Sequence, residues 1–211
     1  MALFITHGIF ASLLSYLWRD KKTKFTVFIL IFIASILPDI DFIFDSKGSG
    51  MFTHRGITHS LFFVAVVGAF FSALFLSSVK SFGQSLLLMF IFFLAGASHC
   101  CLDAMTEATY GVCFFCPFND ERFFFPVTPF SAYTVSHSHK GFRPGLGNSV
   151  WGTILPEILY VWVPTFGIYI ISFYLSDKKT EAASSKANTQ YKPIQIKPKE
   201  TVKKYPHQKK R

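Results

Sequence analysis

The sequence predicts an all-α membrane protein, a class that three observations indicate. Hydrophobic residues make up 51% of the 211 residues and charged residues only 16%, whereas soluble domains carry about 25% charged residues. Phenylalanine alone contributes 27 residues. The apolar residues stand in long blocks and do not recur at the spacing of an amphipathic helix or strand. We therefore expect a polytopic helical bundle of about five apolar segments, with the lipid bilayer as its partner.

The apolar blocks set the order of the expected helices. Residues 25–44, 57–79, 84–102 and 154–175 each approach the roughly 20 residues that a helix needs to cross a bilayer. Residues 3–18 form a shorter block, which must insert if it pairs with the next block in a hairpin. No basic region precedes this first block, so we do not expect a cleaved signal peptide.

The C-terminal tail, residues 177–211, carries nearly all of the net charge of +9. It holds eleven Lys or Arg and three Asp or Glu, which leaves a net charge of only +1 for residues 1–176. We expect a disordered tail and one membrane domain over residues 1–176, with no specific nucleic-acid binding by this core. The tail could attract anionic lipid headgroups, but a solvated topology signal explains it as well, and we favour that interpretation.

The basic residues predict the orientation of the bundle. If all five segments span, the turn at residues 19–24, the turn that holds Lys80 and the C-terminal tail face the same side. The positive-inside rule makes this side cytoplasmic. The N-terminus, residues 45–56 and residues 105–151 then face the outer side, which in a bacterium is the periplasmic side of the inner membrane.

The ionisable residues of the apolar segments collect at the outer ends of these segments. Intramembrane ionisable residues are costly and usually functional, so we take them as candidates for a site. The main group comprises His7, Asp39, Asp41, His54, His59, His99 and Asp103, and further candidates on the same side are Arg122, His137, His139 and Glu157.

Two short motifs in this group suit a cation. His99 and Asp103 have the i, i+4 spacing that puts both side chains on one helix face, although a polar pair at a helix end explains the spacing equally well. Asp39 and Asp41 follow Pro38, which predicts irregular backbone. Two carboxylates at membrane depth, at roughly 2.5 to 3.5 kcal/mol each, need a cation, or water if the helix ends first.

The motif HRGITHS, residues 54–60, begins the third apolar block. His59 is expected in the first helical turn, which fixes it better than the loop fixes His54, so we prefer His59 as a metal ligand. Arg55 cannot bind a cation, but its planar guanidinium suits a phosphate or a carboxylate. An ion pair with Asp39, Asp41 or Asp45 is the alternative for Arg55, and the sequence leaves both open.

Nitrogen and carboxylate ligands without paired thiolates favour zinc, with manganese or iron as alternatives. The number of candidates exceeds what one ion needs, so we expect one or two ions. Cys113 and Cys116 form a C-x-x-C, which is typical of a redox pair, half of a zinc site or a disulfide. Because no second C-x-x-C accompanies it, we favour free thiols in an apolar loop.

The motifs LPDID, HRGITHS and SHCCLDAMT, after a histidine near the N-terminus, resemble the LexA-binding, inner-membrane-associated metal-dependent hydrolase family. The resemblance covers roughly residues 1–175 and implies a polytopic inner-membrane protein with a hydrolase-like metal site. The order of the motifs is also distantly similar to zinc-dependent phospholipase C and P1 nuclease, all-helical enzymes that cleave phosphodiesters. That similarity implies as ligands His7, Asp41, His54 or His59, His99 and Asp103. The second His-x-x-x-Glu motif of those enzymes is missing, and His137, His139 and Glu157 are the candidates to replace it.

These inferences lead to one main hypothesis and two alternatives. In the main hypothesis the protein hydrolyses a phosphoester at the outer face of the inner membrane, and a lipid-like phosphoester is one option. Asp41, His59 and the other ligands hold the metal, whose bound water is the nucleophile, while Asp39 orients that water and Arg55 steadies the anionic substrate. The alternatives are a divalent-cation transporter or channel and a non-catalytic membrane protein with a structural metal site.

Overall fold

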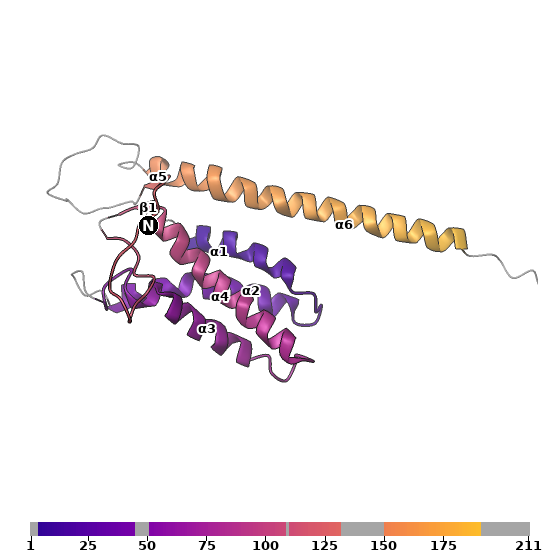
Figure 1. Cartoon of the computed structure of the whole chain (residues 1–211). Helices are drawn as coiled ribbons and strands as arrows, with labels where there is room; N and C mark the ends of the chain where they lie inside the picture. The colour runs from indigo at the N-terminus through magenta and orange to yellow at the C-terminus, as the bar shows by residue number, and fades with distance from the viewer. Residues whose placement is uncertain (1–3, 45–50, 109, 132–149, 191–211) are drawn as a thin grey trace, which may run out of the picture. The chain divides into compact units, whose positions relative to one another are not determined.

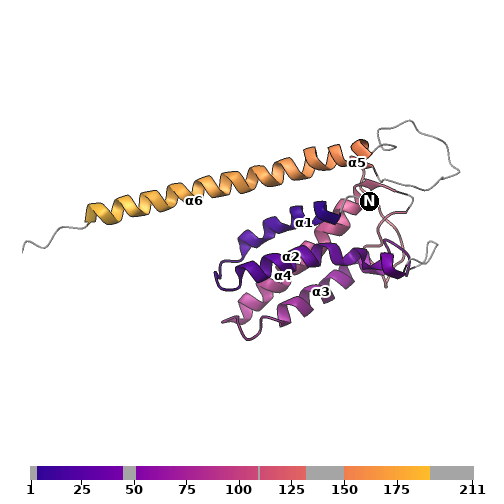
Figure 2. The same cartoon turned by 180° about the vertical axis from the view of Figure 1, so that it is seen from behind.

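The computed structural model describes residues 4–44, 51–108, 110–131 and 150–190. These residues are almost entirely helical, as the sequence predicts. The chain divides into two compact units, Met1–Ile170 and Ile171–Arg211. Four helices, α1 to α4, lie side by side in the first unit (Figures 1 and 2). This unit carries all the candidate site residues.

The first two helices form the expected hairpin. Helix α1 (Phe4–Ser12) tightens into the 3-10 helix η1 (Leu13–Leu17), and a turn leads to α2 (Lys24–Ile36). Trp18 stabilises this turn by donating a hydrogen bond from Nε1 to the Thr23 hydroxyl at 2.8 Å. The chain then continues as the 3-10 helix η2 (Leu37–Phe44), in agreement with the irregular backbone predicted after Leu37.

Helices α3 (Leu61–Ala73) and α4 (Phe82–Ala104) form a second, closely packed hairpin. The Ser60 side chain caps α3 by accepting a hydrogen bond from the backbone N–H of Phe63. At Gly68 a Cβ atom would lie 2.8 Å from the Met89 carbonyl oxygen, so the two backbones approach closely there. The core between the helices is aliphatic and aromatic, with Val27, Ile31, Leu88, Ile91 and Phe92 all buried.

Three helical stretches are long and apolar enough to cross a membrane: Lys24–Ile43, Phe82–Ala104 and Ile154–Ser176. They correspond to three of the predicted blocks. Phe4–Leu17 and Leu61–Ala73 are shorter apolar helices. The third block is shorter than expected because the short 3-10 helix η3 (Ile57–His59) precedes its Ser60 cap, and turns replace the helix after Ala73.

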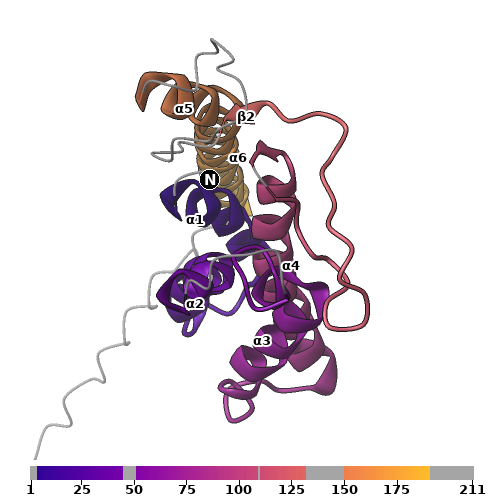
Figure 3. The same cartoon turned by 90° about the vertical axis from the view of Figure 1, so that its left-hand side faces the viewer.

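The segment after α4 returns along the start of α3, as Figure 3 shows. Strand β1 (Thr106–Glu107) pairs in parallel with β2 (Phe130–Ser131). In the chain segment that connects the two strands, Val112 and Phe123 form an isolated antiparallel bridge. Farther along, the backbone N–H of Leu61 donates to the Phe114 carbonyl at 2.9 Å. This returning segment therefore contacts the part of the chain that carries the HRGITHS motif.

The C-terminal part of the described chain is one interrupted helical stretch. It comprises α5 (Val150–Glu157), the π-helical turn η5 (Ile158–Trp162) and α6 (Val163–Gln190). Helix α6 continues beyond residue 175, so the disorder expected for the tail is wrong for residues 177–190. These residues are mostly good helix formers such as Lys, Glu and Ala. Residues 191–211 of the predicted tail lie outside the described residues, and the domain division at residue 176 stays a prediction.

Candidate metal centre

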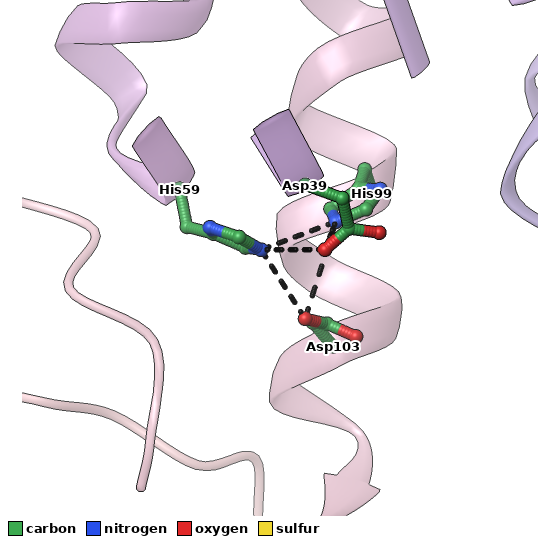
Figure 4. A group of neighbouring side chains, drawn as sticks. All are labelled: Asp39, His59, His99 and Asp103. Atoms are coloured by element: carbon green, nitrogen blue, oxygen red, sulfur yellow. Dashed lines mark hydrogen bonds and ion pairs between the residues drawn. The ribbon is translucent and has the colours of Figure 1, made fainter. Parts of the chain in front are cut away.

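Four side chains from three elements converge at one point of the first unit. Asp39 comes from η2, His59 from η3, and His99 and Asp103 from α4; all are buried, and one ligand atom from each lies within 4.8 Å of the others. Their side chains point toward one another (Figure 4). We call these four residues the metal cluster. The i, i+4 spacing of His99 and Asp103 on a helix therefore has the geometry that the sequence predicts.

His59 lies at the centre of the metal cluster. Its Nε2 is 3.4 Å from Oδ1 of Asp39, 3.3 Å from Oδ2 of Asp103 and 3.2 Å from Nε2 of His99. His99 Nε2 is in turn 3.5 Å from Oδ1 of Asp39. Two histidine nitrogens and two carboxylate oxygens thus face one another at separations that a single small ion can bridge.

The other nitrogen of each imidazole is held by an acceptor outside the metal cluster. His99 Nδ1 lies 2.7 Å from the carbonyl oxygen of Ser35, which can only accept, so Nδ1 carries the proton. His59 Nδ1 lies 3.2 Å from Oδ2 of Asp41. Outer partners of this kind fix the tautomer and the ring orientation of metal-binding histidines, and here they leave both Nε2 atoms directed at the cluster.

Asp39 and Asp41, two residues apart, have different surroundings. Asp41 accepts hydrogen bonds from the Arg55 backbone N–H at 3.1 Å and the Thr58 hydroxyl at 2.8 Å, and its Oδ1 lies 2.9 Å from His54 Nδ1. Among the described residues, neither oxygen of Asp39 has a hydrogen-bond partner. Buried polar groups are normally hydrogen-bonded, so among the described residues only the ion-pair contacts with His59 and His99 compensate the charge of Asp39.

Asp103 has the same deficit as Asp39. Both of its oxygens are buried without a hydrogen-bond partner in the described part of the chain. Arg55 Nε lies 3.2 Å from Oδ2 of Asp103, an ion pair that does not meet hydrogen-bond geometry. Two buried carboxylates and one guanidinium leave an excess of negative charge, and burying such charge is costly unless a counter-ion is present.

The carboxylates also alter the protonation of His59, which precedes α3. Burial alone lowers the pKa of this imidazole, but the neighbouring carboxylates of Asp103, Asp39 and Asp41 outweigh burial and raise the pKa to about 10. The site thus strongly favours a positive charge at the atom on which the metal cluster converges. A proton or a metal ion can supply that charge.

His7 and His54 lie beside the metal cluster. The ring of His7 stacks on that of His99, with centroids 3.9 Å apart, and its Nε2 is 3.9 Å from Oδ1 of Asp103. Neither nitrogen of His7 has a hydrogen-bond partner among the described residues. His54 binds Asp41 and belongs to a second group that could hold a metal ion, formed by Asp41, His54 and His59.

Arg55 is held against the metal cluster by an unusual backbone conformation. Its φ of 62° lies in the left-handed region, and its side chain is only 2% exposed. Nε faces Asp103, and Nη1 donates to the Tyr110 carbonyl at 3.2 Å. Nη2 is buried and has no hydrogen-bond partner within the described ranges. Arg55 therefore forms an ion pair, but its partner among the described residues is Asp103 and not Asp39 or Asp41. Asp45 lies outside the described residues.

Of the additional candidates, Arg122 and Glu157 are described, and they are not part of the metal cluster. Arg122 hydrogen-bonds backbone carbonyls, among them that of Arg55. Glu157 is buried on α5 and accepts a hydrogen bond from the Thr6 hydroxyl. His137 and His139 lie outside the described residues.

Cys113 and Cys116 form a disulfide, so the prediction of free thiols was wrong. The C-x-x-C spacing and the expected outer location are the sequence signals for this bond. Cys100 and Cys101 are free. The carbonyls of Ser35 and Tyr110, by contrast, could not have been selected from the sequence, because any residue has a carbonyl.

Comparison with known proteins supports an inner-membrane assignment. The family described as YdjM inner membrane protein matches residues 1–178. Inner membrane protein YbcI of Escherichia coli (strain K12) is 34% identical over 143 residues, which cover 63% of this chain and 74% of that protein. No solved structure matches the chain. These descriptions agree with the predicted location and name no reaction, so the hydrolase activity stays a prediction. The chain belongs to the YdjM inner membrane protein family.

Proposed function

We propose that this protein is a membrane-bound metal-dependent hydrolase whose ion is held by Asp39, His59, His99 and Asp103. One observation carries the proposal: four buried ligand atoms converge within 4.8 Å, and both imidazoles present Nε2 to the centre while Nδ1 is held from outside. Side chains that merely satisfied one another would not leave both Asp39 and Asp103 without hydrogen bonds.

The spacing of the metal cluster fits a small divalent ion. Ligands at about 2.0 to 2.2 Å from a tetrahedral ion are roughly 3.4 Å apart, and the separations around His59 Nε2 are 3.2 to 3.4 Å. Two nitrogen and two oxygen ligands favour zinc, with manganese or iron as alternatives. When bound, such an ion would supply Lewis acidity and lower the pKa of a water ligand.

The geometry exchanges the roles that we expected for the two aspartates of LPDID. Asp39 is proposed as a ligand, and Asp41 as the outer partner that orients His59. His54 is tied to Asp41, which favours His59 as the ligand. If a second ion binds, His7 Nε2 and Asp103 Oδ1, which are 3.9 Å apart, are the pair that we assign to it.

Arg55 is the reason for proposing a phosphoester as the substrate. Its guanidinium is buried beside Asp103, and among the described residues Nη2 has no hydrogen-bond partner. A planar guanidinium binds phosphate oxygens well. A lipid-like phosphoester suits a site at the ends of apolar helices.

The structural-metal alternative has one observation in its favour, since four protein ligands are also the number found in closed zinc sites. Against it stand the unpartnered groups at the margin of the metal cluster, His7 and Nη2 of Arg55, which a closed site does not need. The transporter alternative requires polar side chains along the whole bundle. The core between α2 and α4 is instead apolar, with Val27, Leu88 and Phe92 buried.

The proposal is tested in purified, detergent-solubilised protein by metal analysis and by a screen of phosphomonoesters and phosphodiesters. Wild-type protein is expected to contain stoichiometric metal and to turn over at least one phosphoester. His99→Ala and Asp103→Ala should lose both properties, whereas Ser98→Ala, whose hydroxyl bonds only the Ala95 carbonyl of the same helix, should keep them. Wild-type protein without bound metal would contradict the proposal, and metal without turnover of any phosphoester would favour the structural alternative.

A further inference from the structure

The left-handed backbone of Arg55 is the starting point for a further inference, which rests on the proposed function. Residues other than glycine seldom adopt a positive φ, because Cβ then approaches the following carbonyl oxygen. Such strain persists only where the surroundings enforce it, and it is concentrated at functional sites. Among the described residues, Arg55 is the only non-glycine residue with a positive φ. It lies next to the metal cluster.

Hydrogen bonds hold the Arg55 peptide groups from both sides. The backbone N–H donates to Oδ2 of Asp41 at 3.1 Å. The carbonyl oxygen accepts from the backbone N–H of Cys113 at 3.0 Å and from Nη1 of Arg122 at 3.4 Å. The acceptor for the N–H therefore lies in η2, and the donors to the carbonyl lie in the segment that returns after α4.

Arg122 organises the whole turn that precedes Arg55. Besides the Arg55 carbonyl, its Nη1 donates to the carbonyls of His54 at 3.3 Å and Gly111 at 3.2 Å, and its Nη2 donates to the Thr53 hydroxyl at 3.0 Å. One guanidinium thus joins residues 53–55 to residue 111. No side chain other than arginine has enough donors in a fixed plane to make these four contacts.

The returning segment is held in shape near its contact with Arg55 by a backbone bridge and by a disulfide. Val112 and Phe123 exchange backbone hydrogen bonds at 2.9 Å, and the disulfide links Cys113, the donor to Arg55, to Cys116. The Phe114 carbonyl accepts from Leu61 at the other end of the HRGITHS motif. Residues 111–123 therefore grip the motif at its beginning and at its end.

We propose that residues 111–123 are a clamp that holds Arg55 in its left-handed conformation and so sets its guanidinium against Asp103, with Arg122 as the positioning residue and the disulfide as the closure. Without the clamp the Arg55 backbone relaxes and the guanidinium leaves Asp103. The ligands Asp39, His99 and Asp103 come from η2 and α4 and do not depend on the clamp, and His59, which lies within the gripped motif, keeps its own contacts with Asp41 and Thr58. Loss of the clamp thus removes anion binding and leaves metal binding largely intact.

The first experiment measures the affinity of the metal-loaded, full-length protein for inorganic phosphate by calorimetry, together with its affinity for the metal alone. Arg122→Gln should bind phosphate about tenfold to a hundredfold more weakly, the loss expected for one charge-assisted contact, while the metal affinity changes little. In an Arg55→Ala background the same substitution should cause no further loss, because Arg122 acts through Arg55. Arg19→Gln, an exposed arginine, is the control.

The disulfide is tested in the same way with Cys113→Ser/Cys116→Ser, for which Cys101→Ser is the control because Cys101 is a free cysteine. The double variant should weaken phosphate binding, and the control should not. Unchanged phosphate affinity in both Arg122→Gln and the double variant, or an additional loss in the Arg55→Ala background, overturns the clamp.

A second readout separates the clamp from the proposed function. Hydrogen exchange of peptides covering residues 51–61, followed by mass spectrometry, should be faster in Arg122→Gln than in wild type and unchanged in Arg19→Gln. If the wild type binds no phosphate, the anionic substrate of the proposed function is wrong, yet this measurement still decides the clamp. Exchange that is equal in Arg122→Gln and in wild type overturns it.

Discussion

His59 and His99 bring their Nε2 atoms to within 3.2 Å of each other, while their Nδ1 atoms are tied to Asp41 and to the Ser35 carbonyl. Two lone pairs cannot face each other at this distance without a positive charge between them. The geometry of the two histidines and the charge of the two carboxylates without hydrogen bonds therefore both favour a cation at this place, and the first three predictions depend on it.

The first prediction separates the two aspartates of LPDID. Asp39→Asn should abolish stoichiometric metal binding, because it removes a ligand at the centre. Asp41→Asn should weaken the metal affinity by about 10- to 100-fold, as is typical of an outer partner of a ligating histidine. Metal titration of the two purified variants measures the difference. Equal losses in both would mean that Asp41 also binds the ion.

The second prediction concerns pH and metal affinity. His59, with its pKa raised to about 10, is protonated at neutral pH when no ion is bound, so a metal ion must displace that proton. The apparent affinity should fall by up to about tenfold for each pH unit of acidification below 10. Proton release on addition of zinc to weakly buffered protein checks this directly, and His59→Ala should release less. Binding without proton release would contradict the protonation that we infer.

The third prediction concerns the stability of metal-free protein. The folded-state pKa of His59 lies above the ordinary value of 6.5, so protonation of His59 contributes stability that is fully present below pH 6.5 and is lost as the pH rises toward 10. Unfolding in detergent after chelation should therefore occur at a lower temperature at pH 9 than at pH 6. His59→Gln should reduce this difference, and an unchanged difference would assign it to another group.

The fourth prediction tests the packing of α3 on α4. Gly68→Ala places a Cβ atom 2.8 Å from the Met89 carbonyl and 3.0 Å from the backbone nitrogen of Phe93, and backbone atoms cannot move aside cheaply. We expect a loss of about 1 to 3 kcal/mol in the free energy of unfolding. Gly167→Ala is the matched control, since nothing lies within 4 Å of its added Cβ. A Gly68→Ala protein as stable as the control would show that the helices can separate without cost.

The fifth prediction tests the orientation that the basic residues imply. A green fluorescent protein fused after residue 211 should fluoresce, because the tail is predicted to be cytoplasmic. Alkaline phosphatase fused at the same place should be inactive. The opposite pattern would put the metal cluster on the cytoplasmic side and reverse the assignment made from Arg19, Lys80 and the tail.

Much of the site could be predicted because its ligands follow local rules. The spacing of His99 and Asp103 needs only the repeat of a helix, and Pro38 announces the irregular backbone of η2. The choice between Asp39 and Asp41 could not be made in this way. In a 3-10 helix, residues two apart point in different directions, and tertiary contacts decide which direction meets His59.

Other features depended on contacts between distant parts of the chain. The left-handed backbone of Arg55 arises from Cys113 and Arg122, more than fifty residues away, and nothing in HRGITHS signals it. The length of α3 was also overestimated, because hydrophobicity measures affinity for lipid and does not show where a helix ends. Its actual end reflects the turns after Ala73.

The 13 residues of α3 have a consequence for the surrounding lipid. A helix of this length is about 20 Å long, roughly 10 Å less than the hydrocarbon thickness of a bilayer. Lipids respond to such a mismatch by thinning locally. Around α3 the headgroups would thus be drawn inward toward the depth of His59, which lies in η3 just before this helix.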